Sequence, residues 1–576
     1  MSDIKVLDDE SINKIAAGEV IERPFSVVKE LVENSIDADA TSILIEVEDG
    51  GKSLISVVDD GCGIAREDLP LAFERHATSK IRAAEDLDSI STLGFRGEAL
   101  SAIASVSRSV EVFTKTRDAR SGSFQRIENG HMERGEAGSP LGTKIVVSGL
   151  FHNLPARRKH LRSAGWELAR ITELVTELAI INHGISFELF SGKRTIFKSA
   201  RSPSWDDVLA RTLGLDAFKG LLPLEADAAG FRIKGMVGNH LLTRSSPDWV
   251  LIYVNGRPVS SRPIQAALRE AYRGLIPRSK SPIAIISIEI DPRWIDVNVH
   301  PTKREVRFLR EEEVIEAVRA IVSSALKRGP SATPEERLRP LGWREPPGLR
   351  RELDMAFIEM EDDIHSHGEQ STLPLEGVDD RLQAILPGQR ILGQVMDLYI
   401  VAEGKDGLLL IDQHAAAERI SYEAISRRIE ESHISQELIV PVAIELSSKE
   451  QVLLETYKPL LVEMGFSIQP FGGRAHQVRA VPATGSHLER PQAIHDLLLD
   501  LFALGKASKG STIREEAIKL LACRGSIKAG EKLSIVDMRR LLHDLLSCNN
   551  PLTCPHGRPT MITVSAEQLE KIFNRR

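Results

Sequence analysis

The sequence has few cysteines, few aromatic residues and no long apolar run. Its 576 residues include only four cysteines, Cys62, Cys523, Cys548 and Cys554, which excludes a disulfide scaffold. No stretch approaches the roughly 20 consecutive apolar residues of a membrane span, and the N-terminus lacks the pattern of a secretory signal. We therefore expect a cytoplasmic protein that does not associate with membranes.

Basic charge is not in excess either. The formal net charge of −8 excludes a uniformly basic, histone-like mode of DNA binding, but it leaves room for a local basic groove. With 42% hydrophobic and 27% charged residues, the chain has the composition of a globular protein with sizeable cores. At a prior of about 150 residues per domain, this length corresponds to about four compact units.

Proline marks the clearest boundary in the chain. Seven of the 28 prolines lie within residues 330–387, a stretch with little periodicity that we interpret as a flexible linker. Before it, strand-like patterns restart near residue 215. The predicted units are therefore residues 1–214, 215–329 and 388–576, with the linker at 330–387.

Helical and strand patterns alternate on both sides of the linker. Residues 26–36 have a helical apolar period after Pro24, and residues 42–48 and 54–58 look like strands. Residues 231–237, 249–254 and 283–290 also have strand patterns, whereas residues 494–504 and 535–546 have helical ones. The expected fold class is therefore α/β (or α+β) with several domains.

Two polar residues, Glu30 and Asn34, share one face of the first helix. A carboxylate there can activate water and an amide oxygen can ligate a hard cation, although for the pair alone a solvated helix face is the favoured interpretation. Downstream, Asp59, Gly61 and Gly63 follow a strand, where a carboxylate can accept a hydrogen bond from an exocyclic amine. Taken alone, this segment is also typical of a turn.

Polar and glycine-rich segments follow. Residues 75–80 read Arg-His-Ala-Thr-Ser-Lys, residues 94–100 read Gly-Phe-Arg-Gly-Glu-Ala-Leu, and Thr143 follows Gly142 on a strand-like stretch. Glycines before a helix provide free N–H groups that bind anions. No P-loop motif occurs in this region to explain these glycines.

These motifs, in this order, resemble those of the GHKL ATPases, which include gyrase B, heat-shock ATPase chaperones, histidine kinases and MutL. Residues 94–100, together with Ala16-Ala17-Gly18-Glu19-Val20 and Pro24, are similar specifically to the MutL mismatch-repair family, across essentially the whole first half. The resemblance implies a GHKL ATPase domain at 1–214 and a transducer domain, of the ribosomal S5 domain 2 type, at 215–329.

The resemblance also implies roles in binding ATP with Mg²⁺. Glu30 would be the general base for ATP hydrolysis, Asn34 would hold the magnesium ion, and Asp59 would bind adenine. The remaining nucleotide-binding residues would be Gly61, Gly63, His76, Thr78, Ser79, Lys80, Gly94, Phe95, Arg96, Gly97 and Thr143. Lys303, in Asn-Val-His-Pro-Thr-Lys, would reach the γ-phosphate.

Basic residues also occur in clusters. Residues 157–162 carry four certain cations, and Arg257 and Arg262 follow a strand. Such runs are usually solvated faces, but the resemblance favours a groove at Arg257 and Arg262 that contacts DNA phosphates without reading the bases. No helix-turn-helix or zinc-finger signature occurs.

A second group of polar residues lies after the linker. Asp412, His414 and Glu418 follow the apolar strand at 408–411, and Cys523, Cys554 and His556 come later. These residue types ligate divalent metals, whereas the first segment alone is also compatible with a helix start capped by Asp412.

These residues resemble the nuclease half of the MutL proteins that nick DNA themselves. The resemblance implies that all six ligate Mn²⁺ and/or Zn²⁺, with Asp412 and Glu418 catalytic in a metal-dependent endonuclease. The carboxylate of Glu423 has no assigned role, and Cys548 matches no ligand position. A non-catalytic, ATP-gated adaptor with a purely structural metal site is the alternative.

One segment is similar to a sliding-clamp-binding motif, and its key residues are Gln436, Leu438, Ile439 and Pro441. An edge strand ended by proline is the simpler interpretation of the segment alone. Within the family, the expected partners are a second copy of the chain, the mismatch-recognition protein MutS, the replication sliding clamp and DNA. The expected function is an ATP-dependent switch that couples mismatch recognition to nicking of the discontinuous or nascent strand, in a cytoplasmic protein that associates with the bacterial nucleoid during repair.

Overall fold

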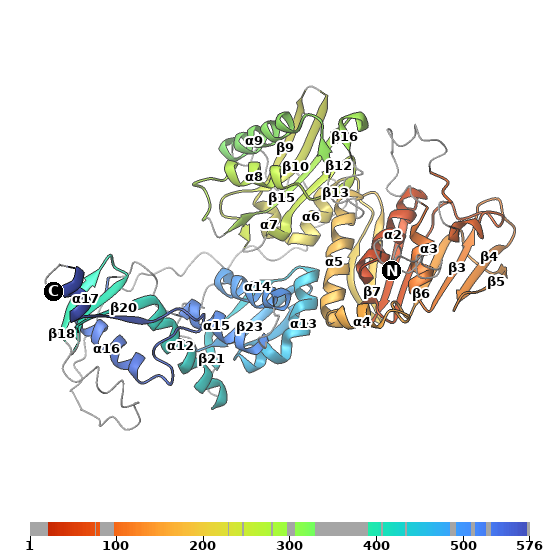
Figure 1. Ribbon diagram of the computed structural model, residues 1–576. Helices are drawn as coiled ribbons and strands as arrows, with labels where there is room; N and C mark the ends of the chain where they lie inside the picture. The colour runs from red at the N-terminus through yellow and green to blue at the C-terminus, as the bar shows by residue number, and fades with distance from the viewer. Residues whose placement is uncertain are drawn as a thin grey trace, which may run out of the picture.

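The computed structural model describes most of the chain on both sides of the predicted linker (Figure 1). The described residues are 21–74, 77–80, 97–228, 230–244, 247–277, 280–296, 306–328, 390–404, 407–431, 435–483, 491–507, 513–525 and 532–572. The linker at 330–387 and the predicted nucleotide-binding residues His76, Gly94, Phe95, Arg96 and Lys303 lie outside them.

An eight-stranded sheet organises the N-terminal part, in the order β5-β4-β3-β6-β2-β1-β7-β8. Its strands are β1 (Ser42–Glu48), β2 (Leu54–Asp59), β3 (Ser109–Lys115), β4 (Gly122–Glu128), β5 (His131–Ala137), β6 (Gly142–Ser148), β7 (Ser186–Ser191) and β8 (Arg194–Ser199). The helices α2 (Pro24–Asp37), α3 (Ala99–Val106) and α5 (Ala164–Ile181) pack against it. One continuous apolar core joins sheet and helices.

Helix α2 forms as its apolar period predicts. Pro24 occupies the first turn, where its missing N–H costs nothing. Val27, Val28, Leu31 and Val32 are fully or almost fully buried against the sheet. The polar residues beside this apolar stripe are thereby held at the edge of the core, next to the end of β2.

The second part is a five-stranded sheet with the order β13-β12-β15-β10-β9. Its strands are β9 (Leu221–Ala228), β10 (Phe231–Gly238), β12 (Val250–Val254), β13 (Arg257–Val259) and β15 (Ala284–Ile290), and the helices α8 (Arg262–Ala271) and α9 (Glu311–Arg328) pack on it. The strands predicted at 231–237, 249–254 and 283–290 are therefore present, with ends displaced by one residue.

The C-terminal part contains two separate sheets. The first, in the order β18-β19-β20-β24, has the strands β18 (Arg390–Val395), β19 (Tyr399–Gly404), β20 (Gly407–Asp412) and β24 (Met561–Ser565). The helices α12 (Gln413–Glu430) and α16 (Ile535–Leu546) cover one of its faces.

The second sheet of this part, in the order β21-β23-β22, has the strands β21 (Ser435–Glu445), β22 (Ser467–Gly472) and β23 (Ala475–Pro482). Its helices are α13 (Ser448–Glu463), α14 (Pro491–Ala507) and α15 (Ile513–Gly525). Helix α12 packs against α15, so the two C-terminal units meet along these helices.

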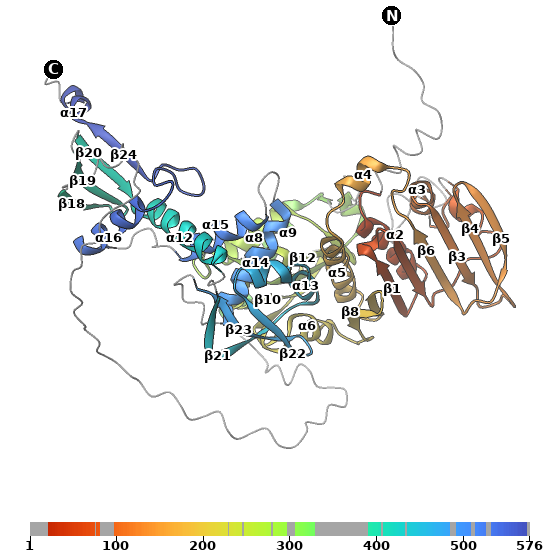
Figure 2. The ribbon, with the colours of Figure 1, turned by 90° about the horizontal axis from the view of Figure 1, so that it is seen from below.

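Helix α13 also packs along α5 of the N-terminal part, as both views show (Figures 1 and 2). At this junction the Lys449 ammonium lies 2.9 Å from a Glu173 carboxylate oxygen and 2.7 Å from an Asp248 oxygen. One largely buried lysine of the C-terminal part thus joins helix α5 to the segment before β12.

The expected fold class is confirmed, because the structure is a mixed α/β arrangement of several units. Among the residues described, no helix is both long and apolar enough to cross a bilayer.

Candidate functional site

Helix α2 presents a row of charged and polar groups that are buried or partly buried. The Lys29 ammonium lies 3.2 Å from a Glu30 oxygen and 3.0 Å from a Glu33 oxygen. The Lys80 ammonium donates to Asn34 Oδ1 at 2.9 Å and pairs with Asp37 at 2.5 Å. A cation therefore sits on the amide oxygen that the sequence assigns to magnesium, which fits an oxygen positioned to ligate positive charge.

The Asp59 carboxylate, at the end of β2, is enclosed by hydrogen-bond donors. Its Oδ2 accepts from the Ser35 hydroxyl at 2.8 Å, and its Oδ1 accepts from the N–H groups of Gly61 at 3.0 Å and Thr143 at 3.2 Å. Burial raises the pKa of Asp59, and these hydrogen bonds only partly oppose the rise. The side chain is therefore fixed, with lone pairs left to accept from a ligand amine.

Two glycines of the predicted site are required by the backbone. Gly63 has φ +75°, and a Cβ on it would lie 2.4 Å from the carbonyl oxygen of Lys115. Gly97 has φ +63°, and a Cβ would lie 2.3 Å from the carbonyl oxygen of Ala77. Both positions combine a left-handed backbone with close approach of another segment, which only glycine tolerates.

Two participating residues were missed by the sequence analysis. Ser35 orients Asp59, and the Thr114 hydroxyl accepts from the Ile64 N–H at 2.8 Å and lies 3.1 Å from the Thr143 hydroxyl. Thr114 is brought here by the pairing of β3 with β6, in which it lies opposite Thr143. No local signal in the sequence indicates such a partner.

The two arginines predicted to bind DNA differ in burial. Arg262 is exposed at the start of α8, whose N-terminus is capped by Ser261. Arg257 is only 9% exposed, and burial lowers its pKa although Glu33 and Asp37 of α2 oppose the change. The structure therefore gives Arg257 a place beside helix α2 rather than on an open surface, which argues against the predicted DNA contact, whereas Arg262 stays available.

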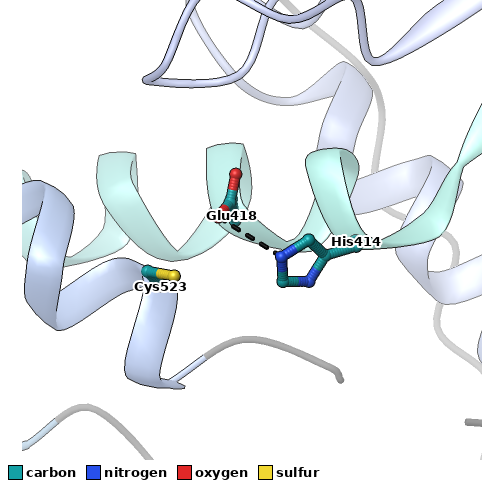
Figure 3. A group of neighbouring side chains, drawn as sticks. All are labelled: His414, Glu418 and Cys523. Carbon is teal, nitrogen blue, oxygen red and sulfur yellow. Dashed lines mark ion pairs between the residues drawn. The ribbon is translucent and has the colours of Figure 1, made fainter. Parts of the chain in front are cut away.

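The predicted metal ligands His414 and Glu418 lie on one face of α12, where the i, i+4 spacing places them. His414 Nε2 is 3.4 Å from Glu418 Oε1, and Cys523 of α15 faces the pair (Figure 3). The donor atoms of these three residues all lie within 4.8 Å of one another. Residues more than 100 positions apart in the chain thus form a compact ligand group.

A second group shares the same carboxylate. His556 Nδ1 lies 3.3 Å from Glu418 Oε2, and Cys554 completes a set whose donor atoms also lie within 4.8 Å of one another. Glu418 is only 5% exposed, and the two side chains nearest its oxygens, His414 and His556, are imidazoles, which are neutral in their ligating form. A buried carboxylate among nitrogen and sulfur donors fits a bound divalent cation.

Asp412 does not join either group. Its Oδ1 accepts from the N–H groups of His414 and Ala415, both at 3.0 Å, so it caps the N-terminus of α12. The simpler of the two interpretations, a helix cap, describes its contacts, because a short carboxylate at this position reaches the free N–H groups of the first turn. Its predicted metal ligation is not supported by this geometry.

The clamp-like segment forms part of β21, an edge strand of its sheet. The register with β23 shifts between Glu437 and Val442, so residues 438–441 bulge out of the ladder. Ile439 is fully exposed, and Leu438 packs partly against the apolar core. The strand continues beyond Pro441 to Glu445, so the proline does not end it, in contrast to the simpler interpretation of the segment.

Comparison with known proteins covers the three folded parts. Family models match residues 21–147 (histidine kinase-, DNA gyrase B-, and HSP90-like ATPase), 209–327 (DNA mismatch repair protein, C-terminal domain) and 392–533 (MutL C terminal dimerisation domain). The first match supports ATP binding and hydrolysis, and the last supports a homodimer.

Whole-chain relatives agree. The DNA mismatch repair protein MutL of Methanothrix thermoacetophila is 54% identical and that of Methanoculleus marisnigri 39%, each over the full length of both chains. A solved structure, the Aquifex aeolicus MutL ATPase domain complexed with ADP, is 27% identical and covers 53% of this chain and 98% of its own, with a TM-score of 0.38. By its full-length identity to these relatives, the chain belongs to the MutL family of DNA mismatch repair proteins.

Proposed function

We propose that this MutL protein is an ATP-regulated endonuclease that nicks DNA during mismatch repair. The observation that carries the proposal is the convergence of His414, Cys523, Cys554 and His556 on the single carboxylate of Glu418. These residues would hold one or two divalent cations. Such cations would polarise a phosphodiester and activate water for attack.

Exposure favours a catalytic rather than a purely structural site. Structural zinc sites are closed by four protein ligands, whereas catalytic sites keep a position open to water or substrate. The side chains of His414 and His556 are 32% and 43% exposed, although Glu418 and Cys554 are buried. The ligand groups are therefore anchored in the core and reachable from solvent.

For the ATPase, we infer the roles that the family motifs assign. Glu30 acts as the general base, Asn34 ligates magnesium with the bound nucleotide, and Asp59 accepts from the adenine amine. The Lys80 ammonium occupies Asn34 Oδ1 here, so a magnesium ion bound with the nucleotide would have to take the place of Lys80 at this oxygen.

Plasmid nicking tests the nuclease. Purified protein with Mn²⁺ is expected to convert supercoiled plasmid to the open circle, and Glu418→Gln to abolish nicking while ATP hydrolysis continues. Glu430→Gln, an exposed carboxylate at the end of the same helix, is the matched control. Wild-type protein that retains zinc but nicks nothing would instead identify an adaptor with a structural metal.

Asp412→Asn gives a second, finer test. The asparagine keeps an Oδ1 to cap α12, so the helix start is preserved. If Asp412 only caps the helix, nicking persists in this variant. Loss of nicking in a variant that still folds would show that Asp412 takes part in catalysis together with Glu418.

We infer that the homodimer forms through the open face of the β18-β19-β20-β24 sheet. Val395, Tyr399, Val401, Leu410 and Ile562 are paired across neighbouring strands on the face opposite to α12 and α16. Three of them are exposed, which is a large apolar surface for a monomer. Leu410→Glu is expected to shift the sedimentation coefficient to that of a monomer, whereas Leu241→Glu, at an exposed site in the second part, leaves the dimer intact.

The remaining partners follow from family membership and from exposed groups. MutS is proposed from the family alone. The bulged residues 438–441 offer apolar side chains to a sliding clamp, and Arg262 offers a cation to DNA phosphate.

A further inference from the structure

Helix α12 carries two charged residues, Arg419 and Glu423, that follow its metal-ligand candidates in the chain. Arg419 and Glu423 are one turn apart, and their side chains are 11% and 12% exposed. The Arg419 guanidinium lies 3.6 Å from a Glu423 oxygen, and it also stacks over the Tyr422 ring at 5.6 Å. Two charged side chains are thus fixed in a partly enclosed position, although neither of them is a ligand in the proposed metal site.

Both side chains bind the backbone of the segment that leads to Cys554. The Glu423 carboxylate accepts from the Asn549 N–H at 2.6 Å and from the Asn550 N–H at 3.1 Å, one oxygen for each. Arg419 Nε donates to the carbonyl oxygen of Thr553 at 2.6 Å. Hydrogen bonds to an ionised group are roughly twice as strong as neutral ones. Helix α12 therefore holds this segment at three successive points.

The segment is a closed turn that presents the ligands. The Cys554 N–H donates to the Arg558 carbonyl at 2.8 Å, and the Gly557 N–H donates to the Cys554 carbonyl at 2.9 Å. At its far end, the carbonyl of Thr560 accepts from the Asp412 N–H at 2.9 Å. One end of the turn is thus hydrogen-bonded to the last residue of β20, and the other end to Arg419 and Glu423 of α12.

We propose that Glu423, supported by Arg419, is a positioning residue that holds Cys554 and His556 against Glu418. The inference rests on the proposed metal site and adds a role for residues outside it. Without these contacts, a loop ordered by few side chains would regain conformational freedom and its ligands would spend less time near Glu418. Residues that orient metal ligands typically contribute 10- to 100-fold in metal affinity.

The properties of the neighbouring Cys548 support the assignment of Cys554, and not Cys548, as the metal-ligating cysteine of this segment. Burial and the Glu423 charge raise its pKa to about 12, and its thiol donates to the Asp544 carbonyl at 3.4 Å. Cys548 therefore stays a neutral thiol at physiological pH, and Cys554 is the cysteine that the turn offers to a metal.

Cobalt binding to the full-length protein tests the proposal without measuring activity. Co²⁺ bound by thiolates gives a charge-transfer absorption whose intensity follows the number of sulfur ligands, and the affinity is obtained by titration. For Glu423→Gln we expect an affinity about 10- to 100-fold weaker than wild type. At a Co²⁺ concentration that saturates the wild type, we also expect roughly half of the charge-transfer intensity per protein molecule, because Cys523 stays in place while Cys554 moves away. The matched control Glu430→Gln is expected to behave as wild type.

The possible outcomes separate the two proposals. Wild-type affinity and intensity in Glu423→Gln would overturn the positioning role while leaving the metal site intact. Absence of a thiolate–cobalt band in the wild type would overturn both. If Glu423→Gln does not fold by circular dichroism, Arg419→Lys takes its place, because it keeps the charge but loses the Nε contact to Thr553, and the same weakening is expected.

Discussion

Asp59→Asn is the substitution that most sharply tests the proposed adenine contact. The geometry allows the asparagine to fit without disturbing the fold. Its Oδ1 can keep the hydrogen bonds from the Gly61 and Thr143 N–H groups, and its Nδ2 can donate to the Ser35 hydroxyl. What changes is the acceptor facing the nucleotide, since an amide N–H₂ cannot accept from the adenine amine.

The expected magnitude follows from the loss of one hydrogen bond to a charged group. Such bonds contribute about 1.5–3 kcal/mol, which corresponds to a roughly 10- to 150-fold weaker ATP affinity. Inosine triphosphate has a carbonyl where ATP has the amine, so wild-type protein is expected to discriminate against it by a similar factor. In Asp59→Asn this preference for ATP should disappear.

Isothermal titration with both nucleotides measures these affinities. The pH dependence of ATP affinity provides a second readout, because burial raises the pKa of Asp59. Only the ionised carboxylate has both oxygens free to accept a hydrogen bond from the adenine amine in addition to the bonds from the protein. As pH falls through that raised pKa, wild-type ATP affinity should drop by about tenfold per pH unit more than that of Asp59→Asn, in which the site cannot titrate. An unchanged preference for ATP over inosine triphosphate in the variant would show that Asp59 does not accept from the adenine amine.

Three further predictions concern other parts of the chain. Arg262→Ala should reduce the slope of log affinity for duplex DNA against log salt by about 0.9, as expected for one lost phosphate contact, and an unchanged slope would remove this arginine from the DNA interface. Lys449→Glu places a negative charge against Glu173 and Asp248. Because breaking a buried ion pair costs about 3–5 kcal/mol, the N-terminal and C-terminal parts should separate, which raises the radius of gyration in small-angle scattering. A scattering curve identical to that of the wild type would contradict this junction. Ile439→Ala should weaken binding to a purified sliding clamp by roughly 10-fold or more in surface plasmon resonance, because moving an isoleucine side chain from water into a pocket contributes about 1.5–3 kcal/mol. Equal binding of the variant and the wild type would argue against this segment as the clamp-binding site.

Local patterns predicted the elements that carry the site. The apolar period of α2 and the strand leading into α12 are properties of short segments, and the structure has both with ends shifted by a residue or two. The gathering of two cysteines and two histidines around Glu418 was predictable because three distant segments each carried ligands of compatible chemistry.

What the sequence did not predict depends on packing between distant segments. Thr114 lies beside Thr143 of the candidate nucleotide site through strand register, and Glu423 meets residues 549 and 550 only because the chain returns to α12. Arg257 was expected on a DNA-binding groove, yet it is buried and interacts with the Glu33 and Asp37 carboxylates of α2. Asp412 illustrates a different limit, since a metal ligand and a helix cap have the same local sequence.

Anomalous scattering from crystals grown with Mn²⁺ or Zn²⁺ shows whether divalent metals assemble around the Glu418 carboxylate. We expect an anomalous peak at coordination distance, about 2.0–2.3 Å, from the ligand atoms of Glu418 and of at least one of the two cysteines. Anomalous peaks found only elsewhere, or none in protein that still nicks DNA, would contradict it.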